Sequence, residues 1–174
     1  MIEEIANLPE SAALIPLSRG AFTIVDTELL RILNLYRWSL LITHDKKRYA
    51  RRYENGQTIY MHREIMNAPS NMEIDHKNGN GLDNRKENLR LSTKSENQMN
   101  SKKRRDGSSI FKGVDCIKKT KKWRARITTK YKRIHLGYFN SEIEAAEAYD
   151  KQAIYHFGEF AKTNFKGVII REVI

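Results

Sequence analysis

Apolar and polar positions alternate in short runs over the first part of the chain, a pattern typical of β-strands joined by tight turns. These runs lie between residues 14 and 66 and are interrupted by turn-forming residues at 43–46 and 54–57. The pattern predicts β-hairpins. A short helix packed on their sheet is predicted at 28–36, where four apolar residues recur at helical spacing: Leu29, Ile32, Leu33 and Tyr36.

The middle of the chain predicts a strand, a loop, a returning strand and a helix. Residues 72–75 read MEID and residues 88–92 read NLRLS, and two Asn-Gly dipeptides between them favour a chain reversal. Thr93 and Glu96 have the spacing of a capping box, so a helix is expected to begin there. This order is a ββα unit over about 72–100, in which the first turn of the helix lies over the strand ends.

The last part of the chain predicts three strands, at 111–117, 122–128 and 133–139, and a helix from Ser141 to near Gly158. Apolar side chains alternate with basic ones along the strands, so one sheet face should be apolar and the other cationic. The apolar stripe of the helix should cover the apolar face. The side chains expected on that face are Trp123, Ala125, Ile127, Ile134, Leu136 and Tyr138.

Residues 101–109 are polar and charged, which is the composition of a linker. They divide the chain into a first domain at 1–100 and a second at 110–174. The expected fold class is α+β: N-terminal β-hairpins lead into the ββα unit, and a three-stranded antiparallel sheet packed on one helix follows. The basic residues 102–105 would also suit a nuclear targeting signal, but beside a basic domain they more often contact phosphate or are solvated.

The formal net charge of +11 is concentrated in the second part of the chain. Residues 1–101 carry 14 Lys and Arg against 13 Asp and Glu, whereas residues 102–174 carry 18 against 8. Such an excess is expected of a protein that binds a polyanion, because neutralised phosphates release counterions. Nucleic acid is therefore favoured over a domain that is basic by chance.

Cysteine content and hydropathy exclude other classes. The single cysteine, Cys116, excludes an internal disulfide and a multi-cysteine zinc site. The N-terminal residues show no signal-peptide pattern, and no apolar run approaches the length of a membrane span. We therefore expect a soluble protein of a reducing compartment, without membrane association.

Four residues of the middle region could form a one-metal phosphodiesterase site within 23 positions. Asp75 and Asn97 can supply a carboxylate and an amide oxygen to a magnesium-like ion. His76, with an ordinary pKa of about 6.5, is mostly neutral at physiological pH and can accept the proton of an attacking water. Asn88 would hold the intervening loop.

Some features of this site stay open. Asn100 lies one helical turn after Asn97 and could replace it as a ligand. His62, expected on a strand or turn, could support the site or be a packed residue. Successive side chains of a strand point to opposite faces, so the chain must bend at or just after His76 if Asp75 is to face the same site.

The segment DHKNGNGLDNRKENLRLST, with MEI before it and KSENQMN after it, resembles the HNH endonucleases of the phage and homing type over about 29 residues. The upstream MHREIM resembles what precedes the motif in these proteins. The resemblance implies that His76 is the general base and that Asp75 and Asn97 ligate a divalent metal. It also implies that Asn88 is a structural asparagine. An asparagine at position 97 favours magnesium over zinc, and manganese is an alternative.

FKGV, WRARI, HLGYF, EAAEAYD and NF, in this order over 110–165, resemble the Apetala2/ethylene-response DNA-binding domain of plants, which also occurs fused to HNH nucleases. The resemblance implies a three-stranded sheet laid in the major groove of double-stranded DNA. Asp115 stands where that family usually has arginine, and His135 where tryptophan is common. The expected DNA contacts are Arg124, Arg126, Arg133 and His135, with Lys119 and Lys122 in a basic turn beside the duplex.

These observations predict a two-domain DNA endonuclease of the HNH class, a homing or mobile-element enzyme. It is expected in the bacterial or phage-infected host cytoplasm, as a monomer or weak dimer without an obligate protein partner. The alternative is a non-catalytic, sequence-specific DNA-binding regulator with a vestigial nuclease fold. Magnesium-dependent cleavage distinguishes the two.

Overall fold

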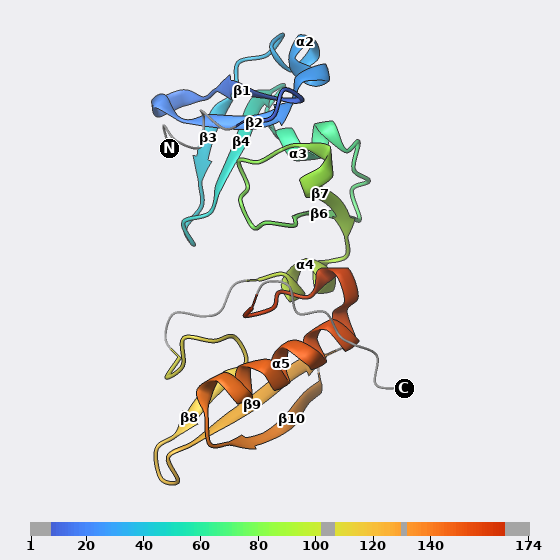
Figure 1. Ribbon diagram of the computed structural model, residues 1–174. Coiled ribbons are helices and arrows are strands. Elements are labelled where there is room, and N and C mark those ends of the chain that lie inside the picture. The colour runs from blue at the N-terminus through green and yellow to red at the C-terminus, as the bar shows by residue number, and fades with distance from the viewer. Residues whose placement is uncertain (1–7, 102–106, 130–131, 166–174) are drawn as a thin grey trace. The chain divides into compact units, whose positions relative to one another are not determined.

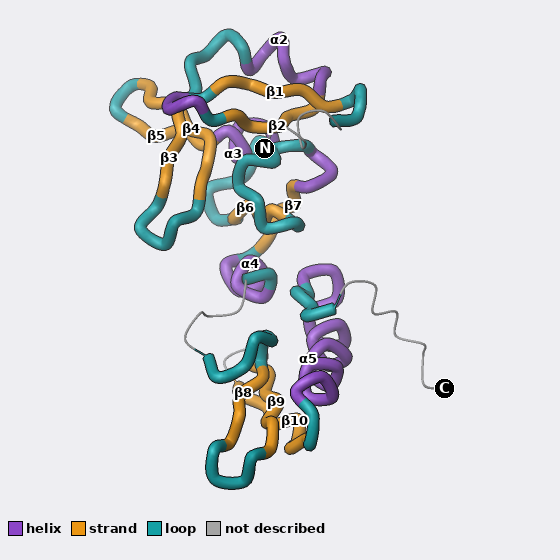
Figure 2. The backbone as a smooth tube through the Cα atoms, turned by 60° about the vertical axis from the view of Figure 1, so that its left-hand side comes forward, coloured by secondary structure: helices purple, strands orange, loops and turns teal. Residues whose placement is uncertain are grey.

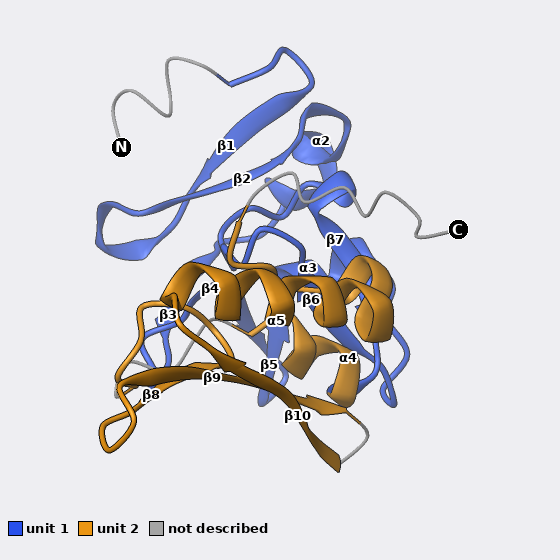
Figure 3. Cartoon of the chain, turned by 60° about the horizontal axis from the view of Figure 1, so that its bottom comes forward, with its two compact units in different colours: residues 1–94 blue, residues 95–174 orange. Residues whose placement is uncertain are grey.

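The computed structural model describes residues 8–101, 107–129 and 132–165 (Figure 1). The chain divides into two compact units, residues 1–94 and 95–174, which are coloured separately in Figure 3. Each unit is described by itself. Among the described residues, no helix is long and apolar enough to cross a membrane.

Small antiparallel sheets are the main regular structure of the first unit (Figure 2). β1 pairs with β2, and β3, β4 and β5 form a second sheet, which confirms the predicted hairpins. The predicted helix at 28–36 is present but shorter. The bounds are β1 Ala12–Pro16, η1 Ser18–Gly20, β2 Phe22–Asp26, η2 Thr27–Leu29, α2 Leu30–Leu33, β3 Ser39–Ile42, β4 Arg48–Glu54, β5 Gln57–Tyr60 and α3 Met61–Ile65.

The core of this unit gathers apolar side chains from almost every element. Trp38 is buried and donates its indole N–H to the carbonyl of Leu33 at 2.8 Å, so its one polar atom is satisfied. Other buried members are Ile15, Leu17, Val25, Ala50, Met61 and Leu82.

The residues around His62 form a helix, α3, where a strand or turn was predicted. The apolar run TIYM suggested a strand. The strand β5 ends within this run, at Tyr60, and the last residue of the run, Met61, is the first residue of the helix. Met61 and Ile65, four residues apart, pack on the core from one helical face. The prediction was wrong because one apolar run spans the end of a strand and the start of a helix.

The predicted strands of the middle region are confirmed as β6, Glu73–His76, and β7, Leu89–Ser92. They pair antiparallel and are joined by a loop that includes η3, Lys86–Asn88. The strand ends at His76, whose carbonyl accepts from the amide of Gly79 at 2.7 Å; Gly79 has a φ of +72°, which glycine adopts readily.

In the second unit the strand order is β10-β9-β8, and the helix α5 runs along this sheet (Figure 1). The predicted capping box is confirmed: the Ser141 hydroxyl accepts from the amide of Ile143, and Glu144 accepts from the amide of Ser141. Ala125 and Ile127 are buried beneath the helix, as the alternation predicted. The bounds are β8 Val114–Ile117, β9 Lys122–Thr129, β10 Lys132–Phe139, α5 Glu142–Phe157 and η4 Gly158–Phe160.

Tyr138 does not lie on the apolar face, where the alternation had placed it. A β-bulge shifts the register between His135 and Gly137, which reverses the alternation beyond it. Phe139 therefore packs on the core, and Tyr138 is 57% exposed opposite Arg124. That part of the prediction was wrong because one extra residue turns every later side chain to the other face.

The helix α4, Lys94–Met99, follows β7 directly, so the predicted helix begins where expected. Of the predicted linker, residues 102–106 lie outside the described part of the chain. Met99 packs against the core of the second unit, and its carbonyl accepts from Lys112 Nζ at 2.6 Å. Ser109, at the end of the predicted linker, is buried and donates to Glu142 Oε1 at 2.6 Å.

Candidate functional site

Asp75 and His76 are both buried at the end of β6. Asp75 lies opposite Arg90 of β7, and its Oδ2 accepts hydrogen bonds from Nε at 2.8 Å and Nη2 at 2.6 Å of that residue. An arginine that binds one carboxylate oxygen through two N–H groups fixes the orientation of the carboxylate. Arg90 was not singled out from the sequence, although it stands in the matched segment.

The imidazole of His76 is enclosed by polar and aromatic groups. Its Nε2 lies 3.2 Å from Asn84 Oδ1, and its ring lies 5.1 Å from that of His62 and 6.1 Å from that of Tyr49. Burial lowers the pKa of His76 below its ordinary value of 6.5, although the Asn84 hydrogen bond and the nearby Asp75 carboxylate oppose the shift. The imidazole is therefore neutral at physiological pH, which a base requires.

His62 is a second buried imidazole in this region. Burial lowers its pKa to about 3, and the neighbouring His76 and Arg63 act in the same direction. Its Nδ1 is buried without a hydrogen-bond partner, and its ring lies 5.5 Å from Tyr49 and 5.4 Å from Tyr60. The structure thus places His62 against His76, a proximity that the sequence left open.

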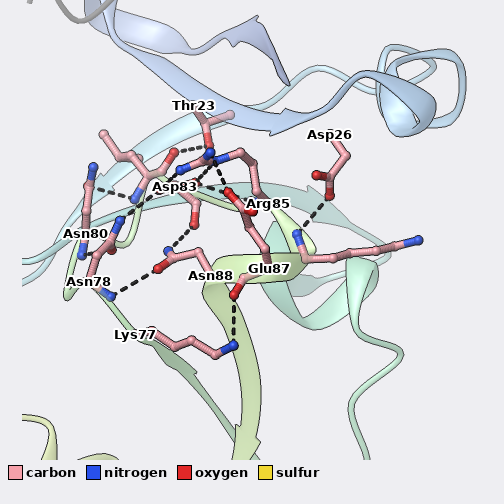
Figure 4. Close-up of polar contacts among 11 residues, drawn as sticks. Thr23, Asp26, Lys77, Asn78, Asn80, Asp83, Arg85, Glu87 and Asn88 are labelled. Carbon is pink, nitrogen blue, oxygen red and sulfur yellow. Dashed lines mark hydrogen bonds and ion pairs between the residues drawn. The ribbon is translucent and has the colours of Figure 1, made fainter. Parts of the chain in front are cut away.

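Asn88 spans the loop that joins β6 to β7 (Figure 4). Its Oδ1 accepts from the amide of Asn78 at 3.0 Å, and its Nδ2 donates to the carbonyl of Asp83 at 2.7 Å. Its own carbonyl accepts from the amide of Lys77 at 2.9 Å. Three hydrogen bonds from one buried residue therefore hold both arms of the loop.

Asp83 is a second organiser of this loop (Figure 4). Its carboxylate accepts from Asn78 Nδ2 at 2.8 Å and from Nε and Nη2 of Arg85, at 2.9 and 2.8 Å. Burial acts to raise the pKa of Asp83, but the hydrogen bonds and charge of Arg85 outweigh it and hold the pKa below its ordinary value. Sequence reasoning missed Asp83 because an Asp-Asn pair in a loop is indistinguishable from ordinary turn residues.

Asn97 lies on α4 and is half-buried, and Asn100 just after the helix is buried. By the division of the chain, Asn97 belongs to the second unit and Asp75 to the first. Their approach to one metal ion therefore stays a prediction. Among the described residues, no group of three or more His, Cys, Asp or Glu side chains could hold a metal ion.

On the outward face of the second unit, Asp115 binds two of the arginines expected to contact DNA. Its Oδ2 accepts from Arg124 Nη2 at 2.7 Å, and its Oδ1 from Arg126 Nη2 at 2.7 Å. Asp115, which stands where the plant family usually has arginine, thus pairs with both Arg124 and Arg126.

The other expected DNA contacts lie on β10, in the turn before β9 and at the first residue of β9. Arg133 and His135 are exposed, as are Lys119 and Lys122. The ring of Tyr138 lies 4.6 Å from that of His135, so an aromatic pair stands on the same face as the arginines. Tyr138 is a candidate DNA contact, although the alternation had placed it in the core. The sequence signal for the bulge that exposes Tyr138 is Gly137, because glycine within a strand often marks a bulge.

Comparisons with known proteins match the region of the candidate site and, for one relative, most of the chain. Residues 67–99 match the family profile described as HNH endonuclease. An uncharacterized HNH endonuclease of Acanthamoeba polyphaga mimivirus is 30% identical over 152 residues, which cover 84% of this chain and 76% of the viral protein.

Plant transcription factors match the C-terminal region. An APETALA2-like protein of Oryza sativa is 47% identical over 62 residues, which are 34% of this chain and 14% of the plant protein. An AP2/ERF and B3 domain-containing transcription factor of Arabidopsis thaliana is 43% identical over 79 residues, 45% of this chain and 22% of that protein. The chain therefore matches only a small part of each plant relative.

The family matches support a nuclease, and the AP2/ERF-type relatives imply that its C-terminal region binds DNA. The chain belongs to the HNH endonuclease family, and its C-terminal region is of the AP2/ERF type.

Proposed function

We propose that this protein is a metal-dependent DNA endonuclease that hydrolyses a phosphodiester bond near a site bound by its C-terminal sheet. The observation that carries the proposal is His76, a buried and neutral imidazole at the end of β6 beside a carboxylate fixed by Arg90. A neutral imidazole next to an acidic residue, in the segment that matches the nuclease family, suits a general base.

In the proposed reaction, His76 takes a proton from a water molecule as that water attacks phosphorus. The bond from phosphorus to the 3′ oxygen breaks, and the departing oxygen takes a proton from solvent. The products carry 5′-phosphate and 3′-hydroxyl ends. Asn88 maintains the loop that follows His76, so its part is structural.

Asp75 and Asn97 would hold the divalent ion, with Asn100 as the alternative to Asn97. Carboxylate and amide oxygens are the ligands that Mg²⁺ and Mn²⁺ prefer. When bound, such an ion stabilises the negative charge that develops on the phosphate and on the leaving oxygen. Arg90 keeps the Asp75 carboxylate in one orientation through its two hydrogen bonds to Oδ2.

Double-stranded DNA is the proposed partner of the second unit. Arg124, Arg126, Arg133 and His135 share the outward face of the sheet, and Lys119 and Lys122 extend the positive charge at its edge. Phosphate contacts by such residues give affinity, and contacts to base edges give sequence preference. A homing or mobile-element role is part of the proposal.

The test of the chemistry is nicking of supercoiled plasmid with and without Mg²⁺. His76→Ala should slow nicking by about 10² to 10⁴, the usual contribution of a general base, while DNA affinity stays within about twofold of the wild type. His44→Ala is the matched control, because His44 is exposed in the β3–β4 turn. Undiminished nicking by His76→Ala would show that the base is another group.

The test of DNA binding is the salt dependence of affinity. Arg133→Ala should lower the slope of log K against log salt concentration by about 1. Binding without cleavage under any metal condition would instead identify the protein as a regulator with an inactive nuclease fold. An unchanged salt slope would place the DNA-binding face elsewhere.

A further inference from the structure

A continuous chain of hydrogen bonds links the backbone of the β6–β7 loop to His76 through two fully buried side chains, Thr23 and Asn84. The Thr23 hydroxyl lies 2.8 Å from the carbonyl oxygen of Leu82. Asn84 Nδ2 lies 2.7 Å from Thr23 Oγ1, and Asn84 Oδ1 lies 3.2 Å from His76 Nε2. Neither Thr23 nor Asn84 belongs to the residues assigned above to base, metal or loop.

The direction of every bond in this chain follows from its first member. A carbonyl oxygen only accepts, so the single hydroxyl proton of Thr23 is donated to Leu82. The Thr23 oxygen must then accept from Asn84, which places the NH₂ group of the amide toward Thr23. The amide oxygen of Asn84 is thereby turned toward His76, and an oxygen acceptor requires a proton on the facing nitrogen.

We propose that Asn84 is a positioning residue that fixes the tautomer of His76: the ring proton stays on Nε2, and Nδ1 is the atom that takes the proton from water. This inference rests on the proposed nuclease function for its catalytic meaning. The tautomer itself is a property of the free protein and can be measured without any reaction.

The surroundings of Asn84 resist reorientation of the amide. Its backbone N–H donates to the carbonyl of Ile24 at 2.7 Å, and the amide of Ile24 donates to Leu82 at 2.8 Å, so β2 holds the loop on both sides of Asp83. Asn84 Nδ2 also approaches Met61 Sδ at 3.7 Å. The opposite tautomer would set the Nε2 lone pair against the Asn84 oxygen, and that hydrogen bond would be lost.

The tautomer of His76 matters because His76 is the proposed general base. A catalytic histidine held in the wrong tautomer can lose as much as about 10⁴ in rate although its position is unchanged. The choice of tautomer matters for a neutral ring. A charged ring, with protons on both nitrogens, would have no tautomer to fix.

The direct test is ¹⁵N NMR of the histidine ring nitrogens in the full chain, with His76 assigned by comparison with His76→Ala. The wild type should show a protonated Nε2 and an unprotonated Nδ1 at neutral pH. A proton on Nδ1 in the wild type would overturn the inference, whether or not the protein cuts DNA.

A substitution at Thr23 tests the inference while both His76 and Asn84 stay unchanged in sequence. Thr23→Val keeps the shape but removes the oxygen that orients the amide, so Asn84 can rotate and present its NH₂ group to His76. The Nε2 tautomer should then lose its dominance, and kcat for nicking should fall at least about tenfold, with KM unchanged. Thr23→Ser keeps the hydroxyl and should restore both the spectrum and the rate.

Two Asn84 variants distinguish loss of the hydrogen-bond acceptor from loss of the fold. Asn84→Leu removes the acceptor at similar volume and should abolish the preference for Nε2, whereas Asn84→Asp keeps an oxygen toward His76 and should retain it. If Thr23→Val and Asn84→Leu both fold and keep the wild-type tautomer, Asn84 does not set it. If the tautomer changes as expected but nicking does not, the assignment of His76 as the base fails instead.

Discussion

Asp115 and Arg124 face each other across the β8–β9 pair, with the carboxylate Oδ2 2.7 Å from the guanidinium Nη2. The same carboxylate binds Arg126 through Oδ1. Partial burial acts to raise the pKa of Asp115, but the hydrogen bonds and charges of the two arginines outweigh it and hold the pKa below its ordinary value. Asp115 is therefore ionised at neutral pH, and it removes part of the positive charge of the proposed DNA-binding face.

Asp115→Asn should strengthen non-specific DNA binding, because two arginines released from a carboxylate become available to phosphate. The slope of log K against log salt concentration should steepen by about 1, the effect of one additional phosphate contact. Discrimination between a selected and a random duplex should fall, because the arginines lose their fixed direction. Titration of both duplexes at several salt concentrations measures these effects.

Glu147→Gln is the matched control for Asp115→Asn, since it removes the same charge from the exposed side of α5, away from the sheet. Its salt slope should match that of the wild type. An equal response of the two variants would show that net charge, rather than the Asp115 cluster, controls binding.

Tyr138→Ala should weaken DNA binding roughly fivefold, because the side chain lies beside His135 on the arginine face and can contact phosphate or sugar. Its side chain is 57% exposed, so the free energy of unfolding should change by no more than about 0.5 kcal/mol. Tyr155→Ala removes a 77% exposed tyrosine from α5 and should leave affinity unchanged. Fluorescence anisotropy with a labelled duplex measures both, and unaltered binding by Tyr138→Ala would remove this residue from the interface.

The error at Tyr138 shows what sequence alternation can and cannot predict. Strands β8 to β10, the capped helix α5 and the burial of Ala125 and Ile127 follow from local periodicity and capping residues. The bulge depends on how β10 pairs with its neighbour, and that register is not a local property. The one sequence signal for the bulge was Gly137, which has a φ of +137° in the structure.

The candidate site shows the same limit. Asp75, His76 and Asn88 stand out because polar residues of these types recur at a recognisable spacing. Asn84 does not, since its role depends on Thr23, which lies 61 residues earlier in the chain and reaches it only after the loop folds against β2. Long-range partners of a loop residue cannot be read from the loop itself.

Asn88→Ala should lower the free energy of unfolding of the first unit by about 2 kcal/mol. The substitution leaves the part-buried amide of Asn78 and the buried carbonyl of Asp83 without these partners, and an unsatisfied buried group costs about 1–3 kcal/mol. Denaturant unfolding followed by tryptophan fluorescence in a Trp123→Phe background measures the loss, because Trp38, in the core of this unit, is then the one tryptophan of the sequence. Asn71→Ala, at an exposed side chain, should unfold like the wild type, and an equal stability of Asn88→Ala would show that the loop does not depend on Asn88.

His62 links the stability of the first unit to pH. Its ordinary pKa of 6.5 applies in the unfolded chain, and burial lowers it to about 3 in the folded protein. The groups that face it are His76, Arg63, Tyr49 and Tyr60, none of them acidic. Below pH 6.5 the unfolded chain binds a proton at His62 that the folded chain does not, so stability is full above pH 6.5 and is lost as the pH falls toward 3.

His62→Phe should therefore flatten the pH dependence of unfolding between about pH 6.5 and 3. Each unit of pH in this interval can cost up to about 1.4 kcal/mol through one such group, so the difference between variant and wild type should grow steadily as the pH falls. Urea titrations at half-unit intervals of pH measure it, and subtraction removes the contributions of the carboxylates, which both proteins share. His44→Phe, at an exposed histidine, should keep the wild-type slope. Parallel curves for His62→Phe and the wild type would show that His62 takes up its proton without unfolding.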